Sequence, residues 1–451
     1  MLLFDSNLYL ILGFSGIILY AYQEHYKNSL LYSTGEINYL AGASFGIAAV
    51  GFSLGLQLSL QKTGFPENIF NKAFFYSALL EELVKYAFIL LFLWYFRIRD
   101  VLYDGIYYGV VIGGVFGFVE NTIYSSVLSF WPMMLRTITS SSLHMLNGGI
   151  AGYFLMKFLF TKENYKHKYL LEGFTIPYIS HAIYNYAGFI GGKYLMLLPL
   201  LLVSNFIFVE FISAFAKSSL PKFALDLIQL SIQDYELIRR YTKYELWLYN
   251  AQKVYKKRIK LFQRVEGKRI LSILFFLFIG FLFIALHSFF PEIRKTIFKE
   301  ILIHEYISIF IIYPFMIAIS VFFGGLVNPE FFQRQILRVP LICVLNLKTA
   351  NYQETTMVFY LTAYGFYAPF IHPEKIQGEL DLNFTIGNKE FKGIKGLAIW
   401  LNENTDESPS AKSRFSVSGA LIRFNKYPLS LILYWNWERW SLRLRNFLNL
   451  M

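Results

Sequence analysis

The chain has 451 residues, of which 55% are hydrophobic, 19% are aromatic and only 16% are charged. This balance excludes a disordered chain, a collagen and an ordinary soluble domain, and it favours a protein that lies in a lipid bilayer. The single cysteine excludes an intramolecular disulfide, and the net charge of +12 is expected of a membrane protein with basic cytoplasmic loops.

Apolar stretches long enough to cross a bilayer recur along the chain, since a helical span needs about 20 mostly apolar residues. The nine predicted spans are Asn7–Gln23, Tyr39–Leu60, Ala73–Phe96, Val101–Phe130, Met133–Phe160, Tyr169–Ile190, Tyr194–Ala216, Ile270–Phe290 and His304–Leu326. The first has neither a basic leader nor a small-residue cleavage site, so we expect a retained helix. The predicted fold class is a polytopic α-helical membrane protein of about nine spans with a C-terminal cytoplasmic small β-barrel.

Lysine and arginine residues set the expected orientation, because short cytoplasmic loops are enriched in them. With the N-terminus outside, the basic loop residues on the cytoplasmic side are Lys27, Arg97, Arg99, Lys162, Lys166 and Lys168. Residues 217–269 contain thirteen Lys or Arg residues and are predicted to form a helical cytoplasmic connector. Basic segments beside a membrane usually meet anionic lipid, so membrane lipid is an expected partner and nucleic acid is not.

The composition changes again after the ninth span. Residues 327–451 show short alternating apolar runs, such as Leu380–Ile386 and Leu397–Leu401, which are typical of β-strands. The predicted parts are an intramembrane module at 1–216, the connector at 217–269, two further spans in 270–326, and a cytoplasmic β domain at 327–451. A tail rich in Trp and Arg, which includes Trp435, ends the β domain and is typical of an interfacial helix.

Four consecutive predicted spans contain charged or titratable residues, which are costly inside a bilayer and indicate a functional site. They are Glu81, Glu82 and Lys85 in the third span, Glu120 and Asn121 in the fourth, His144 in the fifth, and His181 and Asn185 in the sixth. With a helical rise of ~1.5 Å per residue, the glutamates and histidines of these spans lie roughly 12 to 17 Å below the outer surface. A common depth predicts one polar chamber that opens towards the outer leaflet; a purely structural polar network is the alternative.

Spacing along the helices supports a shared site. Glycine recurs every fourth residue from Gly105 to Gly117, and this stripe lets another helix approach closely. Glu120 continues the same face and is therefore expected to point into the bundle. His181 and Asn185 are four residues apart, so they too share a helix face.

These residue types favour hydrolysis. A carboxylate beside imidazoles in an apolar pocket is suited to activating water, and Asn185 could donate a hydrogen bond to a developing oxyanion. A zinc site made of Glu120, His144 and His181 is also consistent with the residue types, because two histidines and one carboxylate form a catalytic zinc set. The competing class is a transporter or signalling receptor in which the same groups couple to protons or to a ligand.

The motifs follow one another as Glu81-Glu82-Leu83-Val84-Lys85, Phe116-Gly117-Phe118-Val119-Glu120-Asn121, His144, and His181-Ala182-Ile183-Tyr184-Asn185. Over roughly residues 39–216 this series resembles the PrsW family of intramembrane proteases, which belongs with the CAAX prenyl endopeptidases and bacteriocin-processing relatives. The resemblance implies that Glu81 activates water, that His144 and His181 position the water or stabilise charge, and that Asn185 assists the oxyanion. Glu82, Lys85 and Asn121 would be supporting groups.

Three points stay open under this resemblance. Glu120 stands where the CAAX enzymes have a histidine, so it could act as a ligand, an acid or a supporting carboxylate. Zinc and a metal-free glutamate mechanism are both compatible with the motifs. An inactive relative that only binds membrane partners is the third interpretation. The implied substrate is a membrane-anchored regulatory protein, such as an anti-sigma factor, cut near the outer face of the bacterial inner membrane.

A second resemblance concerns the β domain. Arg334 and Arg338 lie four residues apart, where two guanidinium groups could clamp phosphates. With Thr362 and Gly365 downstream, residues 331–425 resemble a PilZ domain, a small β-barrel that in many proteins binds cyclic di-GMP. The resemblance implies cyclic di-GMP as an effector held by these four residues. Tyr360 replaces the usual Asp or Asn of the second ligand motif, which favours a structural or partner-docking barrel.

Overall fold

The computed structural model describes residues 16–27, 36–96, 102–160, 166–218, 270–292, 303–327, 343–358, 360–362, 364–402 and 418–448. The chain divides into two compact units. The first, called the helical unit here, consists of Met1–Ser213 and Leu271–Gly324. The second consists of Ala214–Ile270 and Gly325–Met451 and contains the strands, so it is called the β unit.

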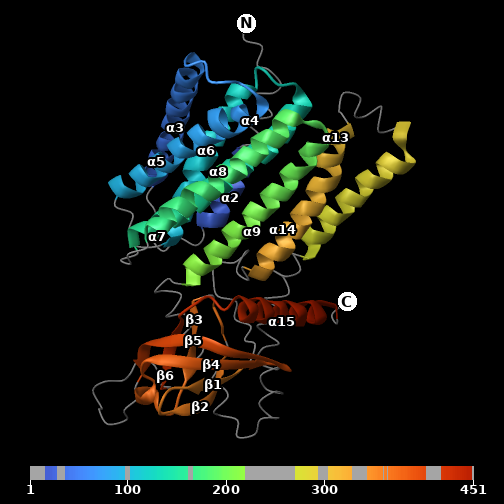
Figure 1. The fold of residues 1–451 in the computed structure, drawn as a ribbon. Coiled ribbons are helices and arrows are strands. Elements are labelled where there is room, and N and C mark those ends of the chain that lie inside the picture. The colour runs from blue at the N-terminus through green and yellow to red at the C-terminus, as the bar shows by residue number, and fades with distance from the viewer. Residues whose placement is uncertain are drawn as a thin grey trace. The chain divides into compact units, whose positions relative to one another are not determined.

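Long apolar helices make up the helical unit. Those described are α2 (Gly16–Lys27), α3 (Glu36–Lys62), α4 (Ile69–Asn71), the π-helix η2 (Lys72–Leu79), α5 (Leu80–Tyr95), α6 (Leu102–Tyr124), α7 (Phe130–Phe160), α8 (His167–Ile190), η3 (Gly192–Met196), α9 (Leu197–Ser218), Ile270–Phe289, α13 (Ile303–Tyr306), the π-helix η4 (Ile307–Ile312) and α14 (Tyr313–Val327). Helix α6 packs against α3 and α7, and α7 also packs against α8 (Figure 1). The intramembrane Glu and His residues singled out in the sequence lie on these helices.

Five described segments are long and apolar enough to cross a membrane. They are Tyr39–Lys62, Leu102–Tyr124, Gly192–Ala216, Ile270–Phe289 and Ile307–Gly324. The third, fifth and sixth predicted spans are also helical, as η2 with α5, as α7 and as α8, and these helices carry most of the charged and titratable groups of the site. The total of about nine spans stays a prediction.

One predicted boundary was wrong. The fourth span was expected to continue to Phe130, but α6 ends at Tyr124 and α7 begins at Phe130. Ser125 and Ser126 follow the end of α6, and their hydroxyls donate hydrogen bonds to the carbonyl oxygens of Thr122 and Ile123 at 2.7 and 3.1 Å. These bonds satisfy carbonyls that the end of a helix leaves without an intrahelical partner, so a polar turn replaces the last predicted turn of helix.

The predicted glycine stripe is a direct helix contact. A Cβ atom added to Gly109 of α6 would collide with the carbonyl oxygen of Gly148 in α7, and one added to Gly105 would collide with that of Gly152. Only glycine allows two helix backbones to come this close. The contact holds α6 and α7 side by side, and both helices carry residues of the site.

The β unit contains one antiparallel sheet of six strands. They are β1 (Cys343–Lys348), β2 (Gln353–Val358), β3 (Gly365–Pro369), β4 (Glu379–Ile386), β5 (Lys389–Asn402) and β6 (Gly419–Phe424), in the spatial order β2-β1-β4-β5-β6-β3. The predicted strands at residues 380–386 and 397–401 are confirmed within β4 and β5. Alternate residues of β4 are buried, as expected of a strand with one face on a core.

The sheet curls into a half-barrel, where the sequence predicted a small β-barrel. Its edge strands β2 and β3 are joined by a hydrogen bond of 2.6 Å from the Thr356 hydroxyl to the carbonyl oxygen of Pro369. Just beyond β3, the backbone N–H of Ile371 donates to the Glu354 carboxylate at 3.0 Å. A short 3-10 turn, η5 (Pro373–Lys375), and the helix α15 (Leu429–Leu448) are also described in this unit, and Trp435 of α15 is fully buried in its core. This tryptophan is therefore a core residue, and the interfacial helix that the sequence predicts stays a prediction.

Candidate active site in the helical bundle

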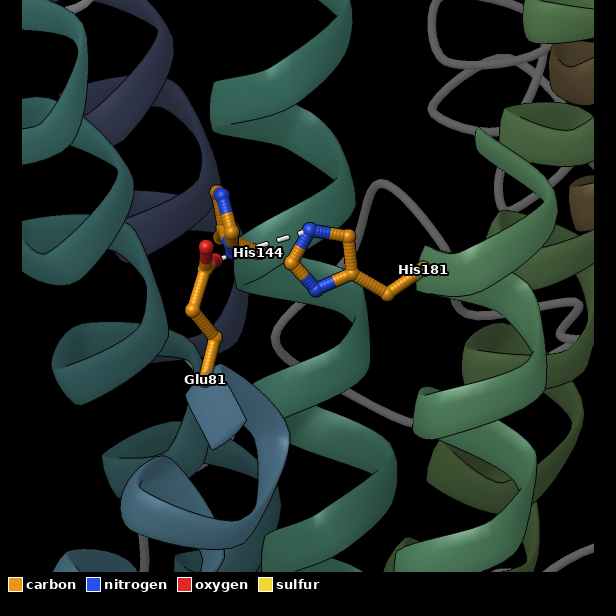
Figure 2. Close-up of side chains that lie close together, drawn as sticks. All are labelled: Glu81, His144 and His181. Atoms are coloured by element: carbon orange, nitrogen blue, oxygen red, sulfur yellow. Dashed lines mark ion pairs between the residues drawn. The ribbon is translucent and has the colours of Figure 1, made fainter. Parts of the chain in front are cut away.

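Three side chains from three helices point towards one another. Glu81 comes from α5, His144 from α7 and His181 from α8, and one ligand atom of each lies within 4.8 Å of the others (Figure 2). The two imidazole rings meet edge to face, with their centroids 5.0 Å apart. All three side chains are buried, so residues that are 100 positions apart in sequence form one compact group in an apolar setting.

The two carboxylate oxygens of Glu81 have different surroundings. Oε1 accepts hydrogen bonds from the Ser77 hydroxyl at 2.8 Å and from the Gln57 side-chain amide at 3.1 Å. Oε2 is buried, lies 3.6 Å from His181 Nε2, and has no hydrogen-bond partner among the described residues. A buried carboxylate oxygen without a partner is costly, and it is the atom of this group best placed to receive a water proton or a cation.

Glu82 fixes the orientation of His181. Its Oε1 accepts a hydrogen bond from His181 Nδ1 at 2.6 Å and another from Lys85 Nζ at 2.5 Å. A carboxylate only accepts hydrogen bonds, so Nδ1 carries the ring proton, and in the neutral ring Nε2 keeps its lone pair towards Glu81. The supporting residues Glu82 and Lys85 that the sequence predicts are thus in direct contact with the group of three.

His144 is held on both sides. Its Nδ1 lies 2.7 Å from Lys85 Nζ, and its Nε2 lies 2.8 Å from Glu120 Oε2. The other oxygen of Glu120 pairs with Arg136 at 2.6 Å. Sequence reasoning missed Arg136, although it is the one arginine in the predicted fifth span and a charge inside a span is itself a signal of function. The name polar cluster is used below for Glu81, Glu82, Lys85, Glu120, Arg136, His144 and His181.

The two predicted asparagines lie in different places. Asn185 donates from Nδ2 to the Ser77 hydroxyl at 2.8 Å, and this hydroxyl in turn donates to Glu81. Asn121 instead donates to the Ser141 hydroxyl of α7 at 3.0 Å, which links α6 to α7. Sequence reasoning also missed Ser77, which lies four residues before Glu81 and donates a hydrogen bond to its carboxylate.

A serine with the spacing of a nucleophile elbow is also present, in Gly51-Phe52-Ser53-Leu54-Gly55. Such an elbow needs a sharp turn between a strand and a helix. Ser53 instead lies in the interior of α3, which runs unbroken from Glu36 to Lys62. The motif therefore does not form an elbow here.

The cluster partly fits a metal ion. Two histidines and a carboxylate are a catalytic zinc set, and the structure gathers Glu81, His144 and His181, whereas the sequence suggested Glu120 in place of Glu81. Glu81 Oε2 and His181 Nε2 face each other without a hydrogen bond between them. His144 could join them only by giving up its contact with Lys85 or with Glu120.

The proposed nucleotide-binding residues of the β unit are only partly described. Arg334 and Arg338 lie outside the described residues. The Thr362 hydroxyl accepts from the backbone N–H groups of Tyr364 and Gly365 and donates to the carbonyl oxygen of Gly365. This hydroxyl is therefore used to form a turn at the start of β3, and a Cβ added to Gly365 would collide with the carbonyl oxygen of Ile422 in β6.

Part of the chain is similar to one family of known proteins. Residues 37–213 match the family model described as PrsW family intramembrane metalloprotease. A curated protein named Protease PrsW from Oceanobacillus iheyensis is 37% identical over 120 residues, which are 27% of this chain and 55% of that protein. The proteins of the same name from Geobacillus kaustophilus and Bacillus subtilis are 28% and 27% identical, over 32% and 31% of this chain and 63% and 65% of their own lengths.

These matches cover part of each protein. The chain spans between 55% and 65% of the length of these three relatives. The whole polar cluster lies inside the region matched by the family model. No solved structure matches the chain.

Proposed function

We propose that the helical unit is an intramembrane peptidase that hydrolyses a peptide bond of a membrane-anchored regulatory protein, such as an anti-sigma factor, near the outer leaflet. The observation that supports this most is Glu81 Oε2, which is buried, has no hydrogen-bond partner among the described residues and faces His181 Nε2. The similarity of residues 37–213 to PrsW family proteases supports the same class of reaction.

In this proposal Glu81 accepts a proton from a water molecule as the water oxygen attacks the carbonyl carbon of the substrate. The tetrahedral intermediate then breaks its C–N bond, and Glu81 returns the proton to the leaving nitrogen. Ser77 and Gln57 hold the other oxygen of the carboxylate, so the base has a fixed orientation. His181 orients the water through Nε2 because Glu82 holds its Nδ1.

Asn185 has a supporting role in the proposed reaction. Its side-chain amide lies one hydrogen bond from the Ser77 hydroxyl, beside the base. An amide donor in this position can stabilise the negative charge that develops on the carbonyl oxygen, because a donor fixed before the reaction needs no reorganisation. Asn121, which bonds Ser141, supports the packing of α6 on α7 instead.

The metal-free and zinc forms of this proposal give Glu81 different roles: it is the base in the metal-free form and a ligand in the zinc form. Glu81, His144 and His181 would hold a zinc ion, which would polarise the carbonyl group and acidify the water. Glu120 would then act on His144 from its other side rather than as a ligand. Removal of metal with a chelator separates the two forms, since only the zinc form loses activity.

We further propose a location in the bacterial inner membrane, with the N-terminus outside and the β unit in the cytoplasm. The basic content of residues 217–269 supports this orientation and a contact with membrane lipid. These connector residues lie outside the described part of the chain.

The test compares membranes of cells that express wild-type or Glu81→Gln protein at equal levels. We expect a truncated single-pass protein with the wild type and its full-length form with Glu81→Gln, because an amide cannot accept the water proton. Glu67→Gln is the matched control, since Glu67 is exposed and outside the polar cluster. The same fragment at the same rate with Glu81→Gln would remove the proposed mechanism.

For the β unit we propose a PilZ-like regulatory module that controls cleavage, with cyclic di-GMP as the candidate effector. The support is a curled antiparallel sheet with a C-terminal helix packed on its core, together with the Arg334 and Arg338 pair in the sequence. Calorimetry of the full chain in detergent with cyclic di-GMP tests this, and Arg338→Ala should abolish the heat of binding. Equal heats with the two proteins would exclude the arginine pair as the site.

A further inference from the structure

Arg136 is a partly buried charge that the proposed reaction does not use. Its guanidinium group pairs with Glu120 Oε1 at 2.6 Å, and 16% of the arginine side chain is exposed. The same group lies 3.9 Å from the centroid of the Tyr124 ring. A planar guanidinium that is stacked on one side and paired on the other is held in one orientation.

The pair controls how Glu120 presents its second oxygen. Oε1 is occupied by Arg136, and Oε2 lies 2.8 Å from His144 Nε2. Because the Lys85 ammonium group can only donate, His144 Nδ1 accepts and His144 Nε2 carries the proton. Lys85 and the Glu120 carboxylate therefore favour the same tautomer of His144, and together they favour one ring orientation.

The contacts continue to the reacting group. From His144 they run through Lys85 to Glu82 and then to His181 Nδ1, with separations of 2.7, 2.5 and 2.6 Å. His181 in turn places Nε2 3.6 Å from Glu81 Oε2. Arg136 is thus the first member of a series of charged and polar contacts that ends at the proposed base.

We propose that Arg136 is a positioning residue of the peptidase site, which acts through Glu120 to fix the tautomer and orientation of His144. This inference rests on the proposed function where cleavage is measured. It does not rest on it where the state of the His144 ring is measured directly. Arg136 need not touch the substrate; its effect is transmitted by the carboxylate that it holds.

The activity test measures the rate of fragment formation in three single variants, Arg136→Gln, Arg136→Lys and Glu120→Gln. A double variant combines Glu120→Gln with Arg136→Gln. We expect Arg136→Gln to slow fragment formation by at least about tenfold, the effect of losing roughly 1.4 kcal/mol of stabilisation. Arg136→Lys should retain part of the rate, because it keeps the charge but not the planar fork. Lys157→Gln is the matched control, since it removes a cation from α7 that contacts Tyr153 and Tyr169 instead of the polar cluster.

The double variant distinguishes positioning through Glu120 from an independent effect. If Arg136 acts through Glu120, the double variant cleaves no more slowly than Glu120→Gln alone. Losses that multiply would overturn the proposal, and so would an Arg136→Gln protein with the full wild-type rate.

A spectroscopic readout keeps the proposal testable even if no substrate is cleaved. In protein labelled with ¹⁵N-histidine, the ring-nitrogen resonances report which nitrogen carries the proton, and a His144→Gln variant assigns those of His144. We expect Arg136→Gln to shift the His144 resonances and Lys157→Gln to leave them in place. Unchanged His144 resonances in Arg136→Gln would refute the inference, whereas shifted resonances without any cleavage would contradict only the proposed function. If Arg136→Gln does not fold, Arg136→Met, which also removes the charge, decides by the same criterion.

Discussion

The side-chain amide of Asn185 donates a hydrogen bond of 2.8 Å to the hydroxyl of Ser77, and the same hydroxyl donates to Glu81 Oε1 at 2.8 Å. Ser77 belongs to the π-helix η2, and Glu81 lies in the first turn of α5, which follows it. A π-helical turn is rare and often marks a functional site, because it shifts the side chains that follow onto a different face. Ser77 therefore joins the proposed base to the proposed oxyanion donor.

The first prediction concerns Ser77→Ala. The substitution removes one of two donors to Glu81 Oε1 and leaves the Asn185 amide without its acceptor. A hydrogen bond to a charged group contributes about 1.5–3 kcal/mol, so cleavage should fall about 10- to 100-fold. The control is Ser59→Ala on α3, whose hydroxyl bonds the carbonyl oxygen of Gly55 in the same helix. Equal rates for the two variants would show that Ser77 does not support the base.

Much of this site could be predicted from the sequence, because charges inside apolar spans are few and each needs a reason. Glu81, His144 and His181 stand out for that reason, and the structure brings them together. Ser77 and Gln57 could not be singled out, since neither side chain carries a charge. Their importance depends on the side chain opposite, which only the packing reveals.

The second prediction tests the contact between α6 and α7. Gly109→Ala places a methyl group against the carbonyl oxygen of Gly148, so the helices must separate. Overpacking of this kind costs about 1–3 kcal/mol, which should lower the melting temperature of the protein in detergent. Gly188→Ala on α8 is the matched control, because an added Cβ there meets nothing within 4 Å. A Gly109→Ala protein as stable as Gly188→Ala would contradict the close contact.

The fold was less predictable where local and tertiary effects compete. The strands at residues 380–386 and 397–401 followed from alternation, because one face of the sheet is buried. Whether the small β-barrel is complete could not be predicted, since closure depends on whether β2 and β3 pair along their backbones. In the structure the Thr356 hydroxyl joins the edge strands β2 and β3 instead. The alternation of apolar residues does not predict such a side-chain contact.

The third prediction concerns pH and Cys343, the single cysteine of the chain. The thiol is fully buried in β1, and burial raises its pKa above the ordinary value of about 8.5. The native thiol should therefore react slowly with iodoacetamide at about pH 8, and rapidly in concentrated urea. Mass spectrometry of the labelled full chain measures both rates. Rapid labelling without urea would show that the core of the β unit is open.

The raised pKa of Cys343 also determines how the stability of the β unit changes with pH. Below about pH 8.5 the thiol is protonated in both the folded and unfolded states, so a change of pH does not alter the folding equilibrium through this group. Above that pH the unfolded thiol loses its proton while the buried thiol of Cys343 keeps it, so the unfolded state is favoured. The free energy of unfolding of the β unit should therefore fall as the pH rises beyond that value.

The last prediction concerns the buried ion pair of Lys85 and Glu82. Their side chains are 2% and 4% exposed, and the nitrogen and oxygen lie 2.5 Å apart. Lys85→Met leaves the Glu82 carboxylate uncompensated and removes the donor to His144 Nδ1. Breaking a buried pair from one side costs about 3–5 kcal/mol, so the melting temperature should fall clearly, and cleavage should be lost. Lys193→Met, at an exposed lysine of η3, is the control and should change neither quantity.

The double variant of Lys85→Met and Glu82→Gln separates stability from chemistry. Replacing both charges removes the uncompensated carboxylate, so the melting temperature should return most of the way to that of the wild type. Cleavage should stay absent, because His144 still lacks its donor and a neutral amide holds His181 less firmly than a carboxylate does. A double variant that recovers both stability and cleavage would show that the pair only neutralises buried charge. Recovery of stability alone would identify Lys85 as part of the arrangement that keeps the two histidines in place.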